Sequence, residues 1–326
     1  MLEHGAAACS YQLLDPGVEH WLADGDDACV GFARVGRTWI AVGAPVTHAD
    51  APTAARAFAA AAARQGGRAL WFLAEAPLRQ QLDPARRWLR IGAQPVWSPD
   101  ALLANFERRR SLRMQLHRAA NKGVVVREWD AGRATGSLAL ARCLLHWLGT
   151  RRAPPLRFLA GPTLLPDLRD RRVFVAERDG APAAYLVLAP IPARHGWLVE
   201  QIVRGSGSCN GTSETLLCAA AAALGAAGAA LLTLGCAPLS RRCGMPWPNG
   251  VTGRALAAAR RWGRRLYDFD GVDAFKAKFR PERWEPLYLG AADGPLRARD
   301  LWALARAEAG GNPIAFALRG LLRRRR

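Results

Sequence analysis

Short apolar runs bounded by turn residues alternate with longer runs of helical period along the first part of the chain. A hairpin is expected where two apolar runs flank Gly36-Arg37. The alanine-rich run that follows ends at Gly66-Gly67, which is a helix stop signal. The predicted elements are, in chain order, strands at 29–35 and 38–43, a helix at 51–67, a strand at 69–75 and a helix at 105–123.

The second part of the chain repeats this alternation. Two apolar runs flank Asp179-Gly180, a dipeptide that favours a two-residue hairpin turn. Thr212 or Ser213 is expected to cap the longest helix, because a hydroxyl oxygen accepts a hydrogen bond from a free amide at a helix start. The predicted elements are a helix at 138–150, a hairpin at Val173–Ile191, a strand at 196–205, a helix at 212–228, a strand at 230–235, and helices at 254–267 and 301–309.

A hairpin, a strand, a loop, a helix and a further strand form the pattern of a GNAT-type acyltransferase fold, and the first part of the chain resembles a degenerate copy of it. The predicted fold class is therefore α+β, with two tandem GNAT-like lobes joined by a basic helix. The predicted parts are an N-terminal lobe at 1–105, a connecting helix at 106–123, a C-terminal catalytic lobe at 124–311 and a basic amphipathic tail at 312–326.

One run, Leu216–Leu234, has 19 residues without a charge, which is long enough to cross a membrane. Alanine and glycine dominate it, and Gly225 and Gly228 lie in its middle. A buried helix followed by a strand is therefore the favoured interpretation.

The net charge of the chain indicates which class of binding partner to expect. Lysine and arginine exceed aspartate and glutamate by 46 − 27, which gives a net charge of +19. Such a surplus predicts a polyanionic partner, either nucleic acid or an anionic membrane surface. Compositional bias toward arginine and alanine is the alternative, but it explains arginine in place of lysine better than it explains the surplus over acids.

The remaining composition gives expectations about compartment and chemistry. The seven cysteines are scattered and form no CxxC pair, which argues against a disulfide framework and a structural zinc site. The six histidines are far apart, so no metal is expected. The N-terminus shows no signal-peptide pattern. We expect a cytoplasmic protein that can contact the inner face of the cytoplasmic membrane.

Five segments together resemble one family, the cytosolic catalytic domain of phosphatidylglycerol lysyltransferases, also called aminoacyl-phosphatidylglycerol synthases. They occur in the family's order and span most of the chain, and the last two are the most specific. The segments are VGRTWIAVGAPV (35–46), RRRSLRMQLHRAANKG (108–123), VRGSGSCNGTSETLL (203–217), LTLGCAPLS (232–240) and YDFDGVDAFKAKFRPERWEPLYL (267–289).

The resemblance implies two GNAT-like lobes that move an aminoacyl group from charged tRNA to a hydroxyl of an anionic phospholipid such as phosphatidylglycerol. It implies no cofactor beyond the aminoacyl-tRNA co-substrate, since the transfer exchanges one ester for another. The long transmembrane part of full-length members is absent here, so the chain resembles a stand-alone form. Such a transfer needs a tRNA-binding surface, a base for the acceptor hydroxyl and a group that stabilises an oxyanion.

The predicted tRNA-binding surface lies on the basic helix. At 100° per residue its cationic side chains share one arc, opposite an apolar stripe that includes Leu112 and Leu116. The same pattern also fits a solvated helix face. The predicted phosphate-binding residues are Arg109, Arg110, Arg113 and His117.

The loop after Arg204 is a second candidate site, because free amides at the start of the next helix favour an anion. Its spacing nearly matches the pyrophosphate loop of acetyl-CoA enzymes, but Cys209 is larger than the glycine or alanine expected there. Asn210 and Gly211 match the family's Asn-Gly. Asn210 is a candidate oxyanion donor or a turn residue, and Gly211 is expected to permit a tight turn in the substrate pocket.

The identity of the base is open. The family pattern has an aspartate three residues before the arginine that corresponds to Arg204, but this chain has Gln201 there. Glu200 is adjacent and would face the other side of a strand. Glu214 stands where the family has an acid on the following helix, and it is the candidate base. Alternatively, a hydroxyl of the tRNA itself shuttles the proton.

Lys276 and Lys278 match the family's Phe-Lys-x-Lys-Phe and are candidates to neutralise a lipid phosphate or a developing oxyanion. In a strand both lysines would share one face, whereas in a helix Phe275 and Phe279 would pack together. Two further aromatic residues are predicted to belong to the core or to wall the acceptor pocket: Trp284 and Tyr288.

The chain ends in an apolar helical pattern followed by arginines, typical of a helix that lies on an anionic bilayer or of a disordered basic tail. Its apolar positions are Ile314, Leu318, Leu321 and Leu322. Two other functions stay open. One is a CoA-dependent N-acyltransferase that uses the 204–211 loop, and the other is a non-catalytic module that binds RNA or membrane.

Overall fold

The computed structural model describes residues 3–25, 27–82, 88–151, 168–243, 254, 257, 260, 261, 263, 264 and 267–323. The strands are β1 (Glu19–Leu22), β2 (Ala28–Val35), β3 (Thr38–Val42), β4 (Val46–Thr47), β5 (Arg68–Ala74), β6 (Leu89–Trp97), β7 (Val125–Trp129), β8 (Arg172–Arg178), β9 (Ala181–Ile191), β10 (Gly196–Arg204), β11 (Leu231–Thr233), β12 (Ala237–Pro238) and β13 (Arg283–Ala291). The helices are α1 (Ala51–Arg64), α2 (Ala76–Leu82), α3 (Pro99–Arg108), α4 (Arg110–Ala120), α5 (Ala131–Ala134), α6 (Leu138–Gly149), α7 (Thr212–Ala226), α9 (Phe269–Ala277), α10 (Ala298–Ala309) and α11 (Pro313–Arg323), with 3-10 turns η1 (Ser10–Leu14) and η2 (Pro192–Arg194).

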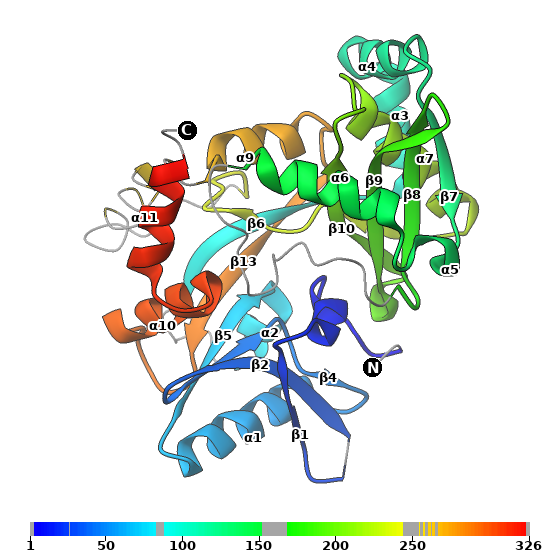
Figure 1. Ribbon diagram of the computed structural model, residues 1–326. Coiled ribbons are helices and arrows are strands. Elements are labelled where there is room, and N and C mark those ends of the chain that lie inside the picture. The colour runs from blue at the N-terminus through cyan, green and yellow to red at the C-terminus, as the bar shows by residue number, and fades with distance from the viewer. Residues whose placement is uncertain are drawn as a thin grey trace.

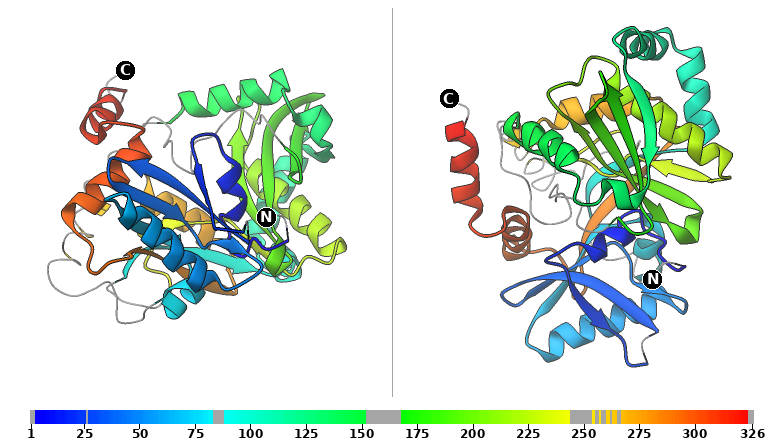
Figure 2. Two further views of the ribbon diagram at one scale, coloured as in Figure 1. Left: turned by 90° about the horizontal axis from the view of Figure 1, so that it is seen from below. Right: turned by 45° about the vertical axis from the view of Figure 1, so that its right-hand side comes forward.

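One mixed sheet runs through the described part of the molecule, in the order β1-β2-β3-β5-β13-β6-β11-β10-β9-β8-β7. Strands β1 to β5 and helix α1 form one lobe, strands β7 to β10 form the other, and β6 and β13 cross between them (Figures 1 and 2). Strand β13 comes from the C-terminal part of the chain, yet it pairs with β5 on one side and β6 on the other. The predicted lobe boundaries stay a prediction, and β13 is a segment that joins the strands of the two lobes into this one sheet.

The local expectations for hairpins are confirmed. Strands β2 and β3 pair across Gly36-Arg37, and β8 and β9 pair across Asp179-Gly180. Asp179 and Gly180 both have positive φ, 52° and 75°, which a two-residue turn of type I′ requires. The uncharged run Leu216–Leu234 is divided between α7 and β11, and none of the helices described could reach across a lipid bilayer.

The single basic helix expected at 105–123 is wrong in one respect, because the chain breaks at Arg109 into α3 and α4. Phe106 and Leu112 explain the break. Six residues apart, they would point about 120° away from each other on one continuous helix, yet both are buried in the same core cluster. The break at Arg109 lets both side chains reach that core.

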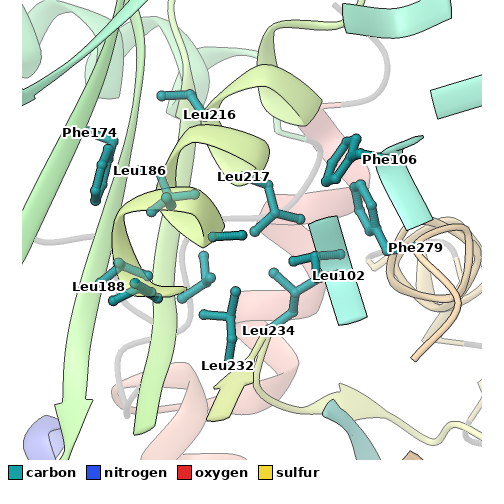
Figure 3. Packing of buried hydrophobic residues seen from close by; sticks show 14 of the residues in the cluster. Leu102, Phe106, Phe174, Leu186, Leu188, Leu216, Leu217, Leu232, Leu234 and Phe279 are labelled. Carbon is teal, nitrogen blue, oxygen red and sulfur yellow. The ribbon is translucent and has the colours of Figure 1, made fainter. Parts of the chain in front are cut away.

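That core cluster fills the space between α7, the basic helices and the strands of the C-terminal lobe. Figure 3 shows leucines of α7 between Leu186 and Leu188 of β9 on one side and Leu102 and Phe106 of α3 on the other. The ring of Phe106 lies 5.8 Å from that of Phe279, centroid to centroid. Phe279 therefore ties the segment after α9 to this core.

The segment around the lysine pair is a helix, α9, so the helical alternative is correct and the strand alternative is wrong. Phe275 and Phe279 pack edge to face with centroids 5.3 Å apart, as the i, i+4 spacing predicts. The expectation that Thr212 or Ser213 caps α7 is wrong, because the N-cap is Gly211. The helix expected at 254–267 lies largely outside the described residues.

Candidate functional site

Strands β10 and β11 run parallel but separate after a short paired stretch. Their pairing extends from Gly196 opposite Leu231 to Leu198 opposite Thr233. Beyond it, β10 continues to Arg204 with β9 as its partner, after a bulge at Val199–Gln201. The chain that leaves β11 therefore carries backbone groups that no longer pair with β10, in the middle of a sheet.

Lys276 of α9 takes the place of the missing strand partner. Its Nζ donates to the carbonyl oxygens of Leu234, Gly235 and Cys236 at 2.7, 2.9 and 2.7 Å. An ammonium group has three N–H donors, so this ammonium is saturated by backbone. Burial lowers the pKa of Lys276 to about 8. Lys276 thus fixes the chain after β11 to α9, and its donors are not directed at an external phosphate.

Lys278 points to a different partner. Residues two apart on a helix project about 160° from each other, and Lys278 Nζ lies 2.6 Å from Glu214 Oε1 in the first turn of α7. The Lys278 ammonium also lies 4.1 Å from the centroid of the Phe275 ring, a cation–π contact. Helix α9 therefore connects the chain after β11, through Lys276, with the helix that follows β10, through Lys278.

Arg204 folds over the loop before α7. Its Nε donates to Ser208 Oγ at 3.2 Å and its Nη2 to the carbonyl oxygen of Cys209 at 3.1 Å. A second cation, Arg151 after α6, lies close by: its pKa is lowered by burial and further by the charge of Arg204. The Arg151 guanidinium stacks 3.9 Å from the ring centroid of Trp147. Sequence reasoning missed Arg151, which carries no motif.

Gly211 is where α7 and the basic helix α4 meet. Its φ is +95°, and a Cβ there would lie 2.0 Å from the carbonyl oxygen of Gln115 in α4. Only glycine combines this φ with so close a backbone approach. The neighbouring Asn210 is exposed on the loop. The start of α7, with Glu214 one turn further on, is thus held directly against α4.

The four predicted phosphate-binding residues lie on α4 or at its start, and all are exposed: Arg109, Arg110, Arg113 and His117. Within the described residues none of the four forms an ion pair with an acid, and Arg113 donates to the carbonyl oxygen of Glu107. Leu112 and Ala119 are buried on the opposite side of the helix. Helix α4 therefore presents an exposed basic face, without acidic partners in the described residues, beside the start of α7.

Glu200 and Gln201, four and three residues before Arg204, are the other predicted pocket residues. Glu200, at the bulge of β10, accepts two hydrogen bonds from Arg171, at 2.7 Å from Nε and 3.1 Å from Nη2. The adjacent Gln201 has a buried Oε1 without a hydrogen-bond partner in the described structure. Both carboxylate oxygens of Glu200 are therefore engaged by one guanidinium, which makes it a structural ion pair and not a candidate base.

Tyr288 and Trp284 both lie in β13 but have different surroundings. Tyr288 is buried in the core of the N-terminal lobe, where Arg79 donates to its hydroxyl at 3.0 Å. Trp284 is half-buried, with the Arg242 guanidinium 5.9 Å from its ring centroid. The structure therefore does not bring Tyr288 to α9 and α7.

A polar cluster between the lobes was not foreseen. Arg194 lies 2.8 Å from Glu285 and 3.2 Å from Glu75, and the fully buried Gln94 donates to both carboxylates. Burial raises the pKa of Glu75. At Glu285 burial also acts to raise the pKa, but the hydrogen bonds and charge of Arg194, together with Gln94 and Arg283, lower it overall. The signal in the sequence was a polar residue inside each of the strands β6 and β13.

Three solved structures resemble this fold over nearly the whole chain. The C-terminal domain of a protein assigned as a lysylphosphatidylglycerol synthetase in Agrobacterium fabrum has a TM-score of 0.75 and 23% identity, and covers 95% of this chain and 92% of its own. L-PGS from Bacillus licheniformis has a TM-score of 0.75 and 21% identity, covering 99% and 94%. A conserved protein from Bacteroides thetaiotaomicron has a TM-score of 0.59 and 14% identity, covering 88% and 90%.

No curated protein matches the chain. The structural likenesses confirm the expected α+β fold class. The family model described as phosphatidylglycerol lysyltransferase, C-terminal, matches residues 2–291, which is most of the chain. The chain therefore belongs to the phosphatidylglycerol lysyltransferase C-terminal family, a family of acyltransferases.

Proposed function

We propose that this protein transfers an aminoacyl group from charged tRNA to a hydroxyl of an anionic phospholipid such as phosphatidylglycerol, without an added cofactor. The single observation that carries the proposal, beside the family, is the helix α9 that joins the two diverging strands. Its Lys278 brings an ammonium to 2.6 Å from the Glu214 carboxylate, and its Lys276 fixes the chain after β11. An acid, a cation and a rigid support are thus assembled at the start of α7.

The reaction requires one proton transfer in each direction. Glu214 accepts the proton of the lipid hydroxyl while the lipid oxygen attacks the ester carbonyl of the aminoacyl group. The Lys278 ammonium stabilises the negative charge that develops on the carbonyl oxygen. As the bond to the tRNA ribose oxygen breaks, the proton passes to that oxygen. If instead a tRNA hydroxyl shuttles the proton, Glu214 positions Lys278.

The tRNA would approach over α4. The exposed Arg110 and Arg113 are free of acidic partners in the described structure, and Gly211 holds α4 against the start of α7. Cations on one helix face can contact successive phosphates, with an affinity that salt weakens. Arg204 and Arg151 lie on the loop side of the same region and are candidates to hold a substrate phosphate.

Transfer is tested with the purified chain, a charged tRNA pool, its synthetases, labelled amino acids and phosphatidylglycerol dispersed in detergent. We expect ribonuclease-sensitive label in the lipid extract. Glu214→Gln and Lys278→Met should each lower the rate by about a hundredfold or more, whereas Lys122→Met, an exposed lysine after α4, should not. An absence of lipid label with every common amino acid contradicts the proposal.

A CoA-dependent acyl transfer is less well supported by the loop geometry. The amide of Ser208 donates to Gly205, and the amide of Cys209 donates to the hydroxyl of Thr212. Two amides at the position of a pyrophosphate loop are therefore already used within the protein. Saturable acetyl-CoA binding that is lost in Arg204→Ala would favour CoA-dependent acyl transfer over aminoacyl transfer from tRNA.

A further inference from the structure

The last two helices carry a concentration of exposed apolar side chains. Leu301 and Trp302 of α10 are 46% and 48% exposed, and Ile314 and Leu318 of α11 are 59% and 55% exposed. We call these four residues the C-terminal apolar face. The two helices contact each other and lie on the same side of the molecule, with α11 projecting from it (Figures 1 and 2). In a monomer in water this much exposed apolar surface needs an explanation.

The opposite side of helix α10 packs against the core. Asp300 and Ala303 are buried there, and Asp300 Oδ2 lies 3.6 Å from Arg68 Nη1. At 100° per residue, Leu301 and Trp302 project from the outer side of the helix. On α11, Ile314 and Leu318 are one turn apart and share a face. Both helices therefore present apolar side chains outward while remaining attached to the fold.

The charges beside this face are basic. Arg299, Arg306 and Arg319 are exposed on the same two helices. Asp300 is fully buried, and one carboxylate oxygen of Glu308 is buried without a partner in the described structure. Burial raises the pKa of Glu308 to about 8, so near neutral pH this carboxyl group adds little negative charge. The outward charge of α10 and α11 is therefore positive.

We propose that the C-terminal apolar face docks on an anionic phospholipid bilayer, with its aliphatic and indole side chains in the interface and its arginines on lipid phosphates. A tryptophan beside aliphatic residues suits the boundary between headgroups and acyl chains, and arginines gain from an anionic surface. A second copy of the chain is the other occupant to consider, but it would bring the arginines of two copies together. The assignment rests on the proposed function, because it supplies the route to a lipid acceptor.

The test is co-sedimentation of the full chain with vesicles of phosphatidylglycerol and phosphatidylcholine, against vesicles of phosphatidylcholine alone. We expect binding to the anionic vesicles, weakened about tenfold or more in Ile314→Asp/Leu318→Asp. Trp302→Ser should weaken it from the other helix. The matched control is Leu138→Asp/Leu145→Asp on α6, where the side chains are 73% and 65% exposed. Circular dichroism checks that each variant is folded.

Equal binding of the wild type and both apolar-face variants to anionic vesicles overturns the assignment. The assignment is also overturned if the wild type does not bind vesicles and instead forms a dimer that the Ile314→Asp/Leu318→Asp variant does not form. Transfer to phosphatidylglycerol in detergent separates this inference from the proposed function. A variant that transfers the aminoacyl group to phosphatidylglycerol in detergent, but not to phosphatidylglycerol in vesicles, supports both the docking face and the proposed function. Vesicle binding that the variants lose, with no transfer in either setting, supports the docking face alone.

Discussion

At the scale of single residues, Lys276 shows how a charged side chain can have a structural role beside a candidate site. Its ammonium is held by three carbonyl oxygens of residues 234–236 at 2.7 to 2.9 Å. These carbonyls follow β11, where the parallel partner strand has turned away. Without the lysine they would be left without a hydrogen bond in a half-buried place, which is costly.

Replacing Lys276 with methionine keeps the unbranched side chain, one atom shorter, and removes the donors. We expect the free energy of unfolding to fall by about 2–4 kcal/mol, because several backbone carbonyls lose their partner. Urea denaturation measures this, with Lys122→Met as the exposed control. A loss within the error of the control would mean that water replaces the ammonium.

Glu308 predicts a pH dependence. Burial raises its pKa in the folded protein to about 8, from an ordinary 4.5. The folded state therefore holds the proton more tightly than the unfolded state, so this contribution to stability is complete below about pH 4.5 and is lost as pH rises toward 8. We expect Glu308→Gln to be the more stable protein at pH 8 by about 1 kcal/mol or more. The difference should shrink toward pH 5; parallel stability curves would show that Glu308 does not titrate in this range.

At the scale of elements, the contact between α4 and α7 places the basic face beside the candidate base. Gly211 makes it possible, because a Cβ would lie 2.0 Å from the Gln115 carbonyl oxygen. Displacing α4 would move Arg110 and Arg113 relative to Glu214. The proposed tRNA-binding face and the candidate base are therefore linked through one glycine.

Gly211→Ala tests this contact, and Gly136→Ala is its control. Both glycines have positive φ, +95° and +68°, but nothing lies within 4 Å of a Cβ at Gly136. The control should lose about 1 kcal/mol from backbone strain alone, while Gly211→Ala should lose several kcal/mol more and transfer should decline with it. Equal losses in thermal or urea unfolding would show that α4 can shift at no cost.

The basic face itself predicts a salt effect. Arg110→Glu/Arg113→Glu should weaken tRNA binding by about tenfold or more and make log Kd less dependent on salt, because fewer counterions are released. Arg56→Glu/Arg64→Glu on α1 reverses the same number of charges in the other lobe. Filter binding across a salt series compares the two. Identical slopes for both variants would mean that net charge, and not α4, attracts the RNA.

At the scale of the whole molecule, β13 makes the two lobes one hydrogen-bonded unit. It pairs with β5 and with β6, although the chain between β6 and β13 builds the entire C-terminal lobe. We expect tryptophan fluorescence and circular dichroism to report the same urea midpoint. Residues 1–105 expressed alone should aggregate, because β5 and β6 would expose the edges that β13 covers. A soluble, cooperatively folded 1–105 fragment would contradict this account.

The local parts of this fold could be predicted from the sequence, whereas its long-range pairings could not. The turn at Asp179-Gly180 and the packing of Phe275 on Phe279 depend on neighbours within four residues. The partners of Lys276 lie about forty residues upstream, and Gln94 meets Glu285 from 191 residues away. No spacing rule reaches across such separations, so the direction of each lysine and the cluster at Glu75 emerge only once the strands are placed.

The position of β13 also affects how the protein is made. Synthesis proceeds from the N-terminus, so β5 and β6 leave the ribosome long before the strand that separates them. Until Ala291 has emerged, the nascent N-terminal half has two facing edges with no occupant. We therefore expect the first lobe to complete its folding only after β13 has emerged, and the uncovered edges favour aggregation of the nascent chain during this interval.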